Sequence, residues 1–243
     1  LNISGCAPVS SSKVVLVTGT TCPSPVEVMP YTQDFESFST CGTVCGNACT
    51  LGGNWTQDPN DDTDWLVDVG TTPSGGTGPT GDFIPGTSAG KYLYIETSGT
   101  GCRNATANLI SPCILVTPGQ CPVLTWGYHM FGSGQGTHNV DISTDQGNTW
   151  TNVFTISGNQ GDQWNRGLVD LNPYVGQTIR LRFQAITLNS LSGDIAIDGV
   201  QLLDFATQPN NFDIVAGAIN NPSSVTVFDP VVDLIPATIG GTF

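Results

Sequence analysis

Apolar and polar side chains alternate with a period of two along several stretches of this chain. From Thr178 to Ala185, Ile, Leu, Phe and Ala occupy one face, and Thr, Arg and Gln occupy the other. The same alternation runs from His138 to Ser143, with His138 on the apolar face. Such alternation predicts β-strands with one buried and one solvated face. Further strands are predicted at Lys13–Thr18, Tyr92–Glu96, Val123–Phe131, Asn152–Ile156 and Ile195–Leu203.

Segments rich in glycine and proline separate these strands, and helical periodicity is almost absent. Three of these segments lie at residues 73–81, 132–136 and 158–161. Many short strands joined by glycine-rich turns are typical of an antiparallel sandwich. We therefore predict an all-β fold, an antiparallel jelly-roll β-sandwich.

The composition divides the chain into three regions. Residues 1–30 hold one predicted strand and a proline-rich stretch, and are predicted to be the end of an upstream module with its linker. Residues 31–206 form the predicted jelly-roll domain. Residues 207–243 resume strand-like alternation, which predicts the start of a further β module or a C-terminal extension. The alternative is that both end segments fold back onto the main domain.

Cysteine content and charge restrict the compartment and the partners. The chain has 8 cysteines, and 20 acidic against 6 basic residues give a net charge of −14. An even cysteine count in such a chain is typical of disulfides formed in an oxidising compartment, which predicts an extracellular or cell-surface location. Nucleic acid and anionic membrane surfaces repel an acidic chain. The chain has no long apolar run, so membrane insertion is not predicted.

Several motifs of the main domain occur in the order found in the MAM family. They are Asp34–Glu36, Asn54–Gln57 with Asp61–Trp65, Gly90–Glu96 with Ala107–Pro112, and Cys121–Gly132 with Gly193–Val200. The chain resembles this family, the extracellular module shared by meprins, neuropilins and receptor tyrosine phosphatases. The resemblance implies a cell-surface adhesion module with a cation site. The family's late cysteine is missing and extra cysteines crowd residues 41–49, which predicts a divergent, bacterial member.

The missing late cysteine leaves Cys121 in need of another partner. Cys113 lies across a short Pro-Gly turn, so we predict a Cys113–Cys121 bridge. A second bridge is predicted between Cys6 and Cys22. Two more bridges, whose pairing is left open, are predicted among Cys41, Cys45, Cys49 and Cys102.

Acidic residues recur in three segments that a jelly roll brings together. Its first and last strands run side by side, and these segments contain no Lys or Arg. Buried carboxylates without a base are costly, and a cation stabilises them. We therefore predict calcium as a cofactor, the alternative being an ordinary solvated acidic loop. The candidate ligands are Asp34, Glu36, Asp62, Asp64 and Asp198.

Residues 143–150 resemble the Asp-box of sialidases and reelin repeats. The motif predicts a hairpin turn in which Asp145 accepts hydrogen bonds from backbone N–H groups. Gly147 supplies the positive φ angle of this turn, and Trp150 packs beneath it. The role predicted for the motif is structural.

Two tryptophans and an arginine are candidates for contact with a ligand. Trp55 and Trp164 are explained less well by family core or Asp-box packing than the other tryptophans are, and Trp164 lies between a polar, glycine-rich run and Arg166. A loop tryptophan beside Asn, Gln and Arg suits contact with a glycan. Hydrophobic anchoring of the loop is the alternative.

No catalytic residues are predicted. Gly86–Gly90 matches the G-x-S-x-G nucleophile elbow, but a strand follows it where the elbow needs a helix. The two histidines, His129 and His138, are predicted to be packed core residues. We therefore predict a non-catalytic, calcium-stabilised recognition module of a larger secreted or surface protein, with polysaccharide as its ligand. The alternatives are a protein–protein (homophilic) adhesion module with a cell-surface protein partner, or a structural spacer in an adhesin or secreted hydrolase.

Overall fold

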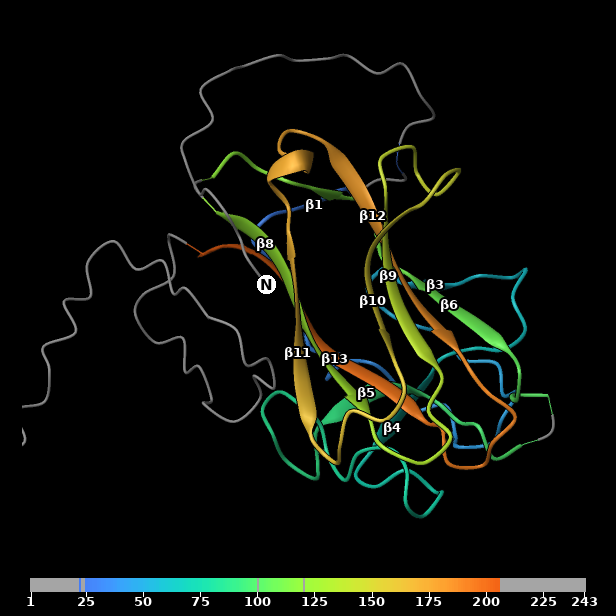
Figure 1. Ribbon diagram of the computed structural model, residues 1–243. Coiled ribbons are helices and arrows are strands. Elements are labelled where there is room, and N and C mark those ends of the chain that lie inside the picture. Colours follow the sequence, from blue (N-terminus) through green and yellow to red (C-terminus); the bar gives the residue numbers. More distant parts are fainter. Residues whose placement is uncertain (1–21, 23–24, 100, 120, 206–243) are drawn as a thin grey trace, which may run out of the picture.

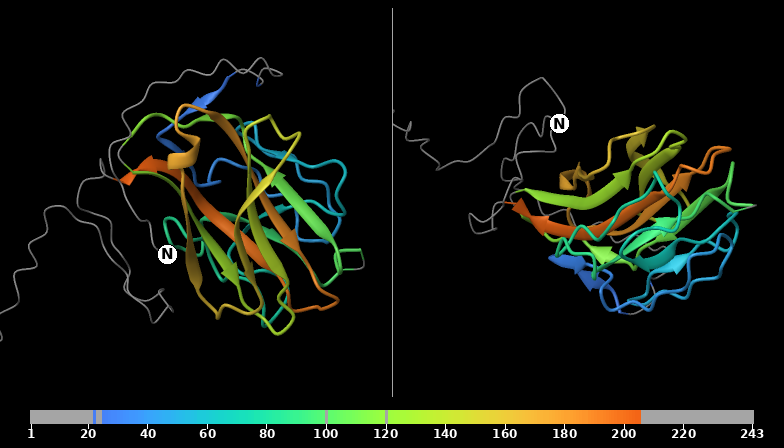
Figure 2. Two further views of the ribbon diagram at one scale, coloured as in Figure 1. Left: turned by 45° about the horizontal axis from the view of Figure 1, so that its top comes forward. Right: turned by 90° about the horizontal axis from the view of Figure 1, so that it is seen from below.

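The computed structural model describes residues 22, 25–99, 101–119 and 121–205. These residues form two β-sheets packed face to face (Figures 1 and 2). One short 3₁₀ helix, η1 (Asn172–Tyr174), joins two of the strands. The strands are β1 (Glu27–Val28), β2 (Tyr31–Gln33), β3 (Thr56–Gln57), β4 (Leu66–Val69), β5 (Lys91–Ile95), β6 (Thr106–Ile110), β7 (Ile114–Leu115), β8 (Pro122–Met130), β9 (Thr137–Ser143), β10 (Thr151–Ser157), β11 (Trp164–Asp170), β12 (Thr178–Ile186) and β13 (Ile195–Asp204).

The two sheets divide the strands almost evenly. The seven-stranded sheet runs β1-β7-β12-β6-β3, with β9 on the other edge of β12 and β10 beyond it. The six-stranded sheet runs β11-β8-β13-β5-β4, and β2 also pairs with β13. The pairings of the described strands are antiparallel except that of β1 with β7. The predicted all-β sandwich is confirmed. Within the described residues, no helix is long and apolar enough to cross a membrane.

The strands predicted from alternation are present within one residue or two at each end. Along β12, Ile179, Leu181, Phe183 and Ala185 are buried, and the residues between them are half-buried. This is the face assignment that the period of two predicts. The strand predicted at Lys13–Thr18 lies outside the described residues.

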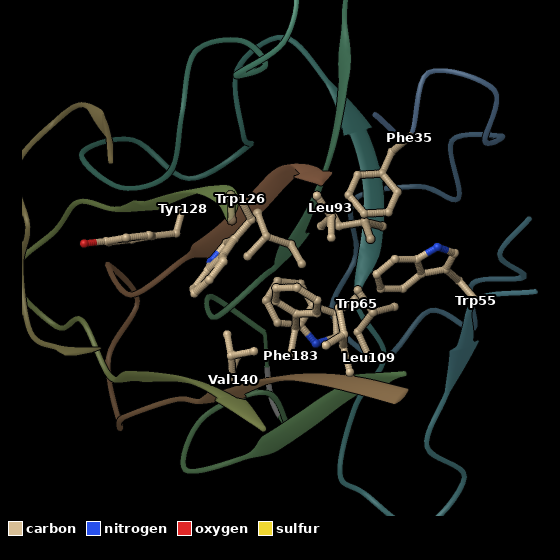
Figure 3. Packing of buried hydrophobic residues seen from close by; sticks show 14 of the residues in the cluster. Phe35, Trp55, Trp65, Leu93, Leu109, Trp126, Tyr128, Val140 and Phe183 are labelled. Carbon is tan, nitrogen blue, oxygen red and sulfur yellow. The ribbon is translucent and has the colours of Figure 1, made fainter. Parts of the chain in front are cut away.

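Aromatic side chains from both sheets fill the space between them. Trp126 of β8 meets Phe183 of β12 edge to face, with ring centroids 5.7 Å apart (Figure 3). Trp65 and Phe183 are fully buried. Such offset and edge-on contacts add about 0.5–1.5 kcal/mol each beyond the burial of apolar surface.

His138 lies inside this aromatic core and is completely buried. Its Nε2 accepts a 3.1 Å hydrogen bond from the indole nitrogen of Trp126, and its Nδ1 lies 3.2 Å from the carbonyl oxygen of Gln184. An indole N–H only donates and a carbonyl only accepts, so the ring is neutral with its proton on Nδ1. Burial lowers the pKa of His138 to about 4. The prediction of packed core histidines is confirmed for both, since His129 is 2% exposed.

The first strands of the described chain join the last. β2 pairs with β13, with Tyr31 opposite Leu202, so the predicted contact between the first and last strands of the domain is confirmed. β1 lies in the segment predicted to be a linker, yet it pairs with β7. The sandwich therefore begins before residue 31.

The disulfides differ from both of the specific pairs that we predicted. Cys22 is bonded to Cys113, so the predicted Cys6–Cys22 and Cys113–Cys121 bridges are wrong. The reason is spatial: the parallel pairing of β1 with β7 places the segment before β1 beside Cys113. Cys121 is also disulfide-bonded. The pairs left open from sequence are Cys41–Cys49 and Cys45–Cys102.

Candidate functional site

Three of the five predicted calcium ligands hold nearby backbone groups, each in a different place. Asp34 accepts a hydrogen bond from the backbone nitrogen of Glu36 at 3.2 Å, which makes a local turn directly after β2. Asp62 accepts from the backbone of Thr106 at 2.8 Å. Asp64 accepts from the backbone of Cys49 at 3.0 Å.

The fourth candidate, Asp198, is buried in β13 and bonded to a loop. Its Oδ2 accepts hydrogen bonds from the backbone nitrogens of Phe83 and Ile84 at 2.8 and 2.9 Å. Its Oδ1 accepts from the backbone of Gly199 at 2.6 Å. Burial raises the pKa of Asp198 to about 7, against these three hydrogen bonds, which favour the charged form. Asp198 therefore anchors the loop between β4 and β5 to the sheet.

The fifth candidate, Glu36, lies beside the ammonium group of Lys91. The Lys91 Nζ donates to the carbonyl oxygens of Glu36 and Phe38 at 2.8 and 2.7 Å, and the Lys91 backbone nitrogen donates to the Glu36 carboxylate at 2.7 Å. The ammonium group therefore lies against two backbone carbonyls, and the Glu36 carboxylate is held by the backbone of β5. β5 lies outside the acidic segments from which the calcium site was predicted.

The structure does not bring the five carboxylates together. The residues described contain no group of three or more His, Cys, Asp or Glu side chains placed to hold a metal ion. All five carboxylates instead accept hydrogen bonds from backbone nitrogens, in the separate networks given above. Calcium binding by this set stays a prediction without geometric support.

A surface hollow of about 310 Å³ lies where β11 begins, beside the connection between β4 and β5. In Figure 1 this connection (teal) passes the lower end of β11. The size is at the lower end of the range for small-molecule sites. The hollow is lined by Pro79, Thr80, Gly81, Asp82, Gly86, Thr87, Ser88, His129, Asp162, Gln163 and Trp164.

Trp164 forms the aromatic wall of the hollow. Its indole nitrogen donates a 3.0 Å hydrogen bond to the carbonyl oxygen of Gly81. Its ring packs against Phe83, Tyr92 and His129, with centroids 5.8, 6.1 and 5.5 Å away. Trp164 is the first residue of β11, so the prediction that it lies in a loop is wrong at this position. Its half-buried ring is held on one side by the core and lines the hollow on the other.

Polar groups line the rest of the hollow. The side chain of Asp162 is 59% exposed, and its carboxylate lies 3.4 Å from the Nε2 of buried His129. Burial lowers the pKa of His129 to about 4, so at neutral pH the imidazole is neutral and donates to Asp162. Asp82 is buried below the hollow and accepts a hydrogen bond from the backbone of Thr87. The sequence did not predict Asp162, His129 or Asp82 as site residues, because they come from separate loops and one buried strand.

Ser88, the central residue of the elbow-like motif, lines the same hollow. It lies in an exposed bend before β5 and not at the start of a helix. The Nδ1 of His129 is buried without a partner and its Nε2 faces Asp162, so within the described residues neither nitrogen is hydrogen-bonded to Ser88. The hollow therefore lacks the nucleophile–base contact that acyl transfer uses.

The other two predicted ligand contacts lie in different surroundings. Trp55 is 2% exposed, donates to the Tyr31 hydroxyl at 2.8 Å and packs against Phe35, so its ring belongs to the core. Arg166 is exposed on β11, and its guanidinium lies 5.0 Å from the centre of the Phe83 ring. Phe83 also contacts Trp164, so Arg166 adjoins the hollow through that ring.

The hairpin between β9 and β10 has the contacts predicted for its turn. Asp145 accepts hydrogen bonds from the backbone and hydroxyl of Thr149 at 2.8 and 2.6 Å. Gly147 has a φ of +95°, and a Cβ built there would lie 3.2 Å from the Trp150 ring. The hydrogen bonds from Thr149 lower the pKa of Asp145 to about 2. They assign this motif to the hairpin, away from the hollow.

Comparison with known proteins decides the family. The MAM domain family (meprin/A5/mu) matches residues 34–208. This chain belongs to the MAM family. MAM domain-containing glycosylphosphatidylinositol anchor protein 2 of Mus musculus is 32% identical over 193 residues, which are 74% of this chain and 19% of that protein. Neuropilin-1a of Danio rerio is 30% identical over 184 residues, 71% of this chain and 19% of that protein.

The chain therefore spans about a fifth of the length of these relatives and corresponds to their adhesion-type MAM module. Among solved structures, the K1 cleaved adhesin domain of Lys-gingipain from Porphyromonas gingivalis W83 aligns with a TM-score of 0.49 and 16% identity, over 72% of this chain and 97% of that one. The carbohydrate-binding module TmCBM61, in complex with β-1,4-galactotriose, aligns with a TM-score of 0.40 and 12% identity, over 62% and 88% of the two chains.

Proposed function

We propose that this MAM module binds a polysaccharide in the hollow around Trp164. One observation carries the proposal: a half-buried indole forms one wall of a hollow whose other walls are hydroxyls, carboxylates and an amide. A sugar ring has an apolar C–H face and a rim of hydroxyl groups. A flat aromatic surface beside converging polar groups matches both.

The wall of the hollow is fixed before any ligand arrives. Trp164 is held by its hydrogen bond to Gly81 and by the rings of Phe83 and Tyr92. Side chains that are already ordered lose little conformational entropy on binding. Asp162 and Gln163 are exposed at the rim, where they can reach ligand hydroxyls.

A glycan array tests the proposal with variants that change the rim and leave the core intact. The variants are Asp162→Asn and Gln163→Ala, and the matched controls outside the hollow are Asp62→Asn and Gln177→Ala, all at exposed positions. We expect the wild type to retain a subset of glycans, the hollow variants to lose most of this retention, and the controls to keep it. Retention of no glycan by the folded wild type would contradict the proposal.

Protein–protein adhesion is the second candidate, and one loop favours it. Ile186, Leu188 and Leu191 follow one another at the end of β12 and are 36, 50 and 53% exposed. Exposed apolar groups in one place mark contact sites on soluble proteins. Homophilic binding through this loop would aggregate beads coated with the wild type, and a Leu188→Ser variant would not aggregate them.

The proposed setting is extracellular, with no catalytic turnover. Disulfides such as Cys45–Cys102 persist in oxidising compartments, and one of the relatives above is named as a glycosylphosphatidylinositol anchor protein. No hydrolysis of esters, peptides or the bound glycan is expected. Turnover that Ser88→Ala abolishes would contradict the binding role.

A further inference from the structure

The hollow beside β11 is lined by acidic side chains and by no basic one. Asp82 and Asp162 belong to its lining, which contains no Lys or Arg. The ion pairs of the described residues are His129 with Asp162 and Arg182 with Asp141. Burial lowers the pKa of His129 to about 4, so this imidazole is neutral at neutral pH. Within the part of the chain that the structure describes, neither carboxylate of the hollow is therefore paired with a cationic side chain.

The Asp82 carboxylate is buried below the hollow with one oxygen unpaired. Asp82 is 4% exposed, and its Oδ1 accepts a hydrogen bond from the backbone of Thr87. Its Oδ2 has no hydrogen-bond partner. A Cβ built at Gly90 would lie 2.1 Å from this oxygen, so glycine leaves the room that the carboxylate occupies. A buried carboxylate without a partner is costly, and a positive charge in the hollow would lower that cost.

His129 adds a second buried acceptor that has no donor. Its Nε2 carries the proton that it shares with Asp162, so its Nδ1 can only accept a hydrogen bond. His129 is 2% exposed, and this Nδ1 is buried without a partner. Because the imidazole is neutral, this observation is independent of the acidic charge. Both buried groups indicate that a hydrogen-bond donor is missing from the hollow.

An aromatic ring and a solvent-accessible carboxylate lie together at the rim. Trp164 of β11 is paired with His129 of β8, and their rings are 5.5 Å apart. Asp162 lies two residues before Trp164, its side chain is 59% exposed, and its carboxylate is 3.4 Å from the Nε2 of His129. A carboxylate forms strong hydrogen bonds with a cation, and the face of an indole ring also attracts one. An occupant of the hollow therefore meets two groups that favour positive charge.

We propose that a protonated amino sugar occupies the hollow, so that the polysaccharide bound by this module carries free amino groups. This inference rests on the proposed function and names the chemical class of its ligand. An ammonium group supplies both the charge and the hydrogen-bond donors that the hollow lacks, and the apolar face of the sugar ring packs against Trp164. A neutral hydroxyl supplies donors without charge, and an anionic sugar is repelled.

Two further observations favour an ammonium group on a polymer. The described residues contain no group of three or more His, Cys, Asp or Glu side chains placed to hold a metal ion, which is the other class of cation. The net charge of −14 attracts a polymer that carries many positive charges and raises its rate of association.

Isothermal titration calorimetry on the whole chain tests the inference with three tetramers that differ only at carbon 2 of each ring. They are the β-1,4-linked tetramers of glucosamine, N-acetylglucosamine and glucose, which carry an amine, an acetamide and a hydroxyl there. At about pH 6 a primary amine is protonated. We expect the glucosamine tetramer to bind about tenfold more tightly than either neutral tetramer, because hydrogen bonds that involve a charged group are the stronger ones. Added salt should reduce this preference.

Matched variants assign the preference to the hollow. Asp162→Asn should reduce the affinity for the glucosamine tetramer to about that of the neutral tetramers. Asp62→Asn makes the same change in net charge at an exposed position outside the hollow and should keep the preference. Gln163→Ala removes a neutral rim contact and should weaken the binding of all three tetramers without changing their ranking.

The inference is overturned if the wild type does not prefer the glucosamine tetramer, or if the preference survives in Asp162→Asn. Tetralysine is the control for charge without sugar rings, and equally tight binding of tetralysine would assign the hollow to a basic peptide and also overturn the inference. If the array retains neutral glycans while the glucosamine tetramer has no advantage, the amino-sugar inference fails and the proposed function stands. Retention of no glycan, amino or neutral, contradicts both.

Discussion

The indole nitrogen of Trp164 donates a 3.0 Å hydrogen bond to the backbone carbonyl of Gly81. This bond joins the first residue of β11 to the connection between β4 and β5, the two segments that form the hollow. The same connection is fixed to β13 through the bonds from Phe83 and Ile84 to Asp198. The proposed binding site therefore rests on bonds that join three segments far apart in sequence.

Replacing Trp164 with phenylalanine tests the first anchor. The variant keeps an aromatic ring beside Phe83 and Tyr92 but loses the donor to Gly81. A net protein hydrogen bond contributes about 1 kcal/mol, so we expect the free energy of unfolding in urea to fall by that order. An unchanged urea midpoint would show that the bond is not a structural anchor.

The neutral core histidine predicts a loss of stability in acid. His138 has a folded-state pKa of about 4, below its unfolded value of about 6.5. The unfolded chain therefore binds the proton more readily, and this contribution to stability is complete above pH ~6.5 and is lost as the pH falls toward ~4. Between pH 7 and 4.5 the loss from this one group is about 2–3 kcal/mol.

His138→Gln isolates that contribution, because a glutamine amide can still accept from Trp126 and donate to the Gln184 carbonyl. Urea unfolding at both pH values should show a smaller acid loss in the variant than in the wild type. The remainder includes His129, whose pKa is lowered in the same direction. Equal losses in the two proteins would contradict the assignment.

Lys91 is predicted to stabilise the segment after β2. Methionine at this position keeps the length of the side chain and removes the donors to the carbonyls of Glu36 and Phe38. Hydrogen bonds from charged groups contribute about 1.5–3 kcal/mol each, and water can replace part of this at a half-buried site, so a loss of about 1–3 kcal/mol is expected. Arg103→Met, which removes one exposed bond to Ser98, is the control and should lose much less.

The two bridges of the cysteine-rich loop should differ in their contribution to stability. Cys45–Cys102 closes a sequence separation of 57 residues, and Cys41–Cys49 closes one of 8. Loop-closure entropy predicts about 4 kcal/mol for the longer loop and about 2.5 kcal/mol for the shorter one. Paired alanine variants, compared by chemical denaturation, should rank in that order. The reverse ranking would mean that strain or residual unfolded-state structure dominates.

Alternation along the chain was sufficient to predict strands such as β9 and β12, because both have one buried apolar face. It missed β11, where the buried positions include Asn165 and Gly167. A Cβ at Gly167 would lie 2.2 Å from the Trp126 ring, so the tryptophan covers the position where a side chain would be. A buried strand of this kind has no period-two signal.

Sites that depend on pairing between distant strands could not be predicted from spacing. His129 and Trp164 are 35 positions apart, and only the register of β8 with β11 places them opposite each other. Cys22 and Cys113 meet for the same reason, through β1 and β7. Trp164 was predicted as a ligand contact from its polar neighbours, and the structure places it at the wall of the hollow. The glycan contact itself stays a prediction.

The most direct test of the proposed function is fluorine NMR of protein that carries 5-fluorotryptophan at its 5 tryptophans. Trp55, Trp65 and Trp126 are buried, and Trp150 is half-buried outside the hollow, so four of the signals are internal controls. The Trp164→Phe spectrum assigns the fifth. On addition of a polysaccharide selected by the array, the Trp164 signal should shift and the Trp150 signal should stay. A polysaccharide that binds and leaves the Trp164 signal unchanged would contradict the account.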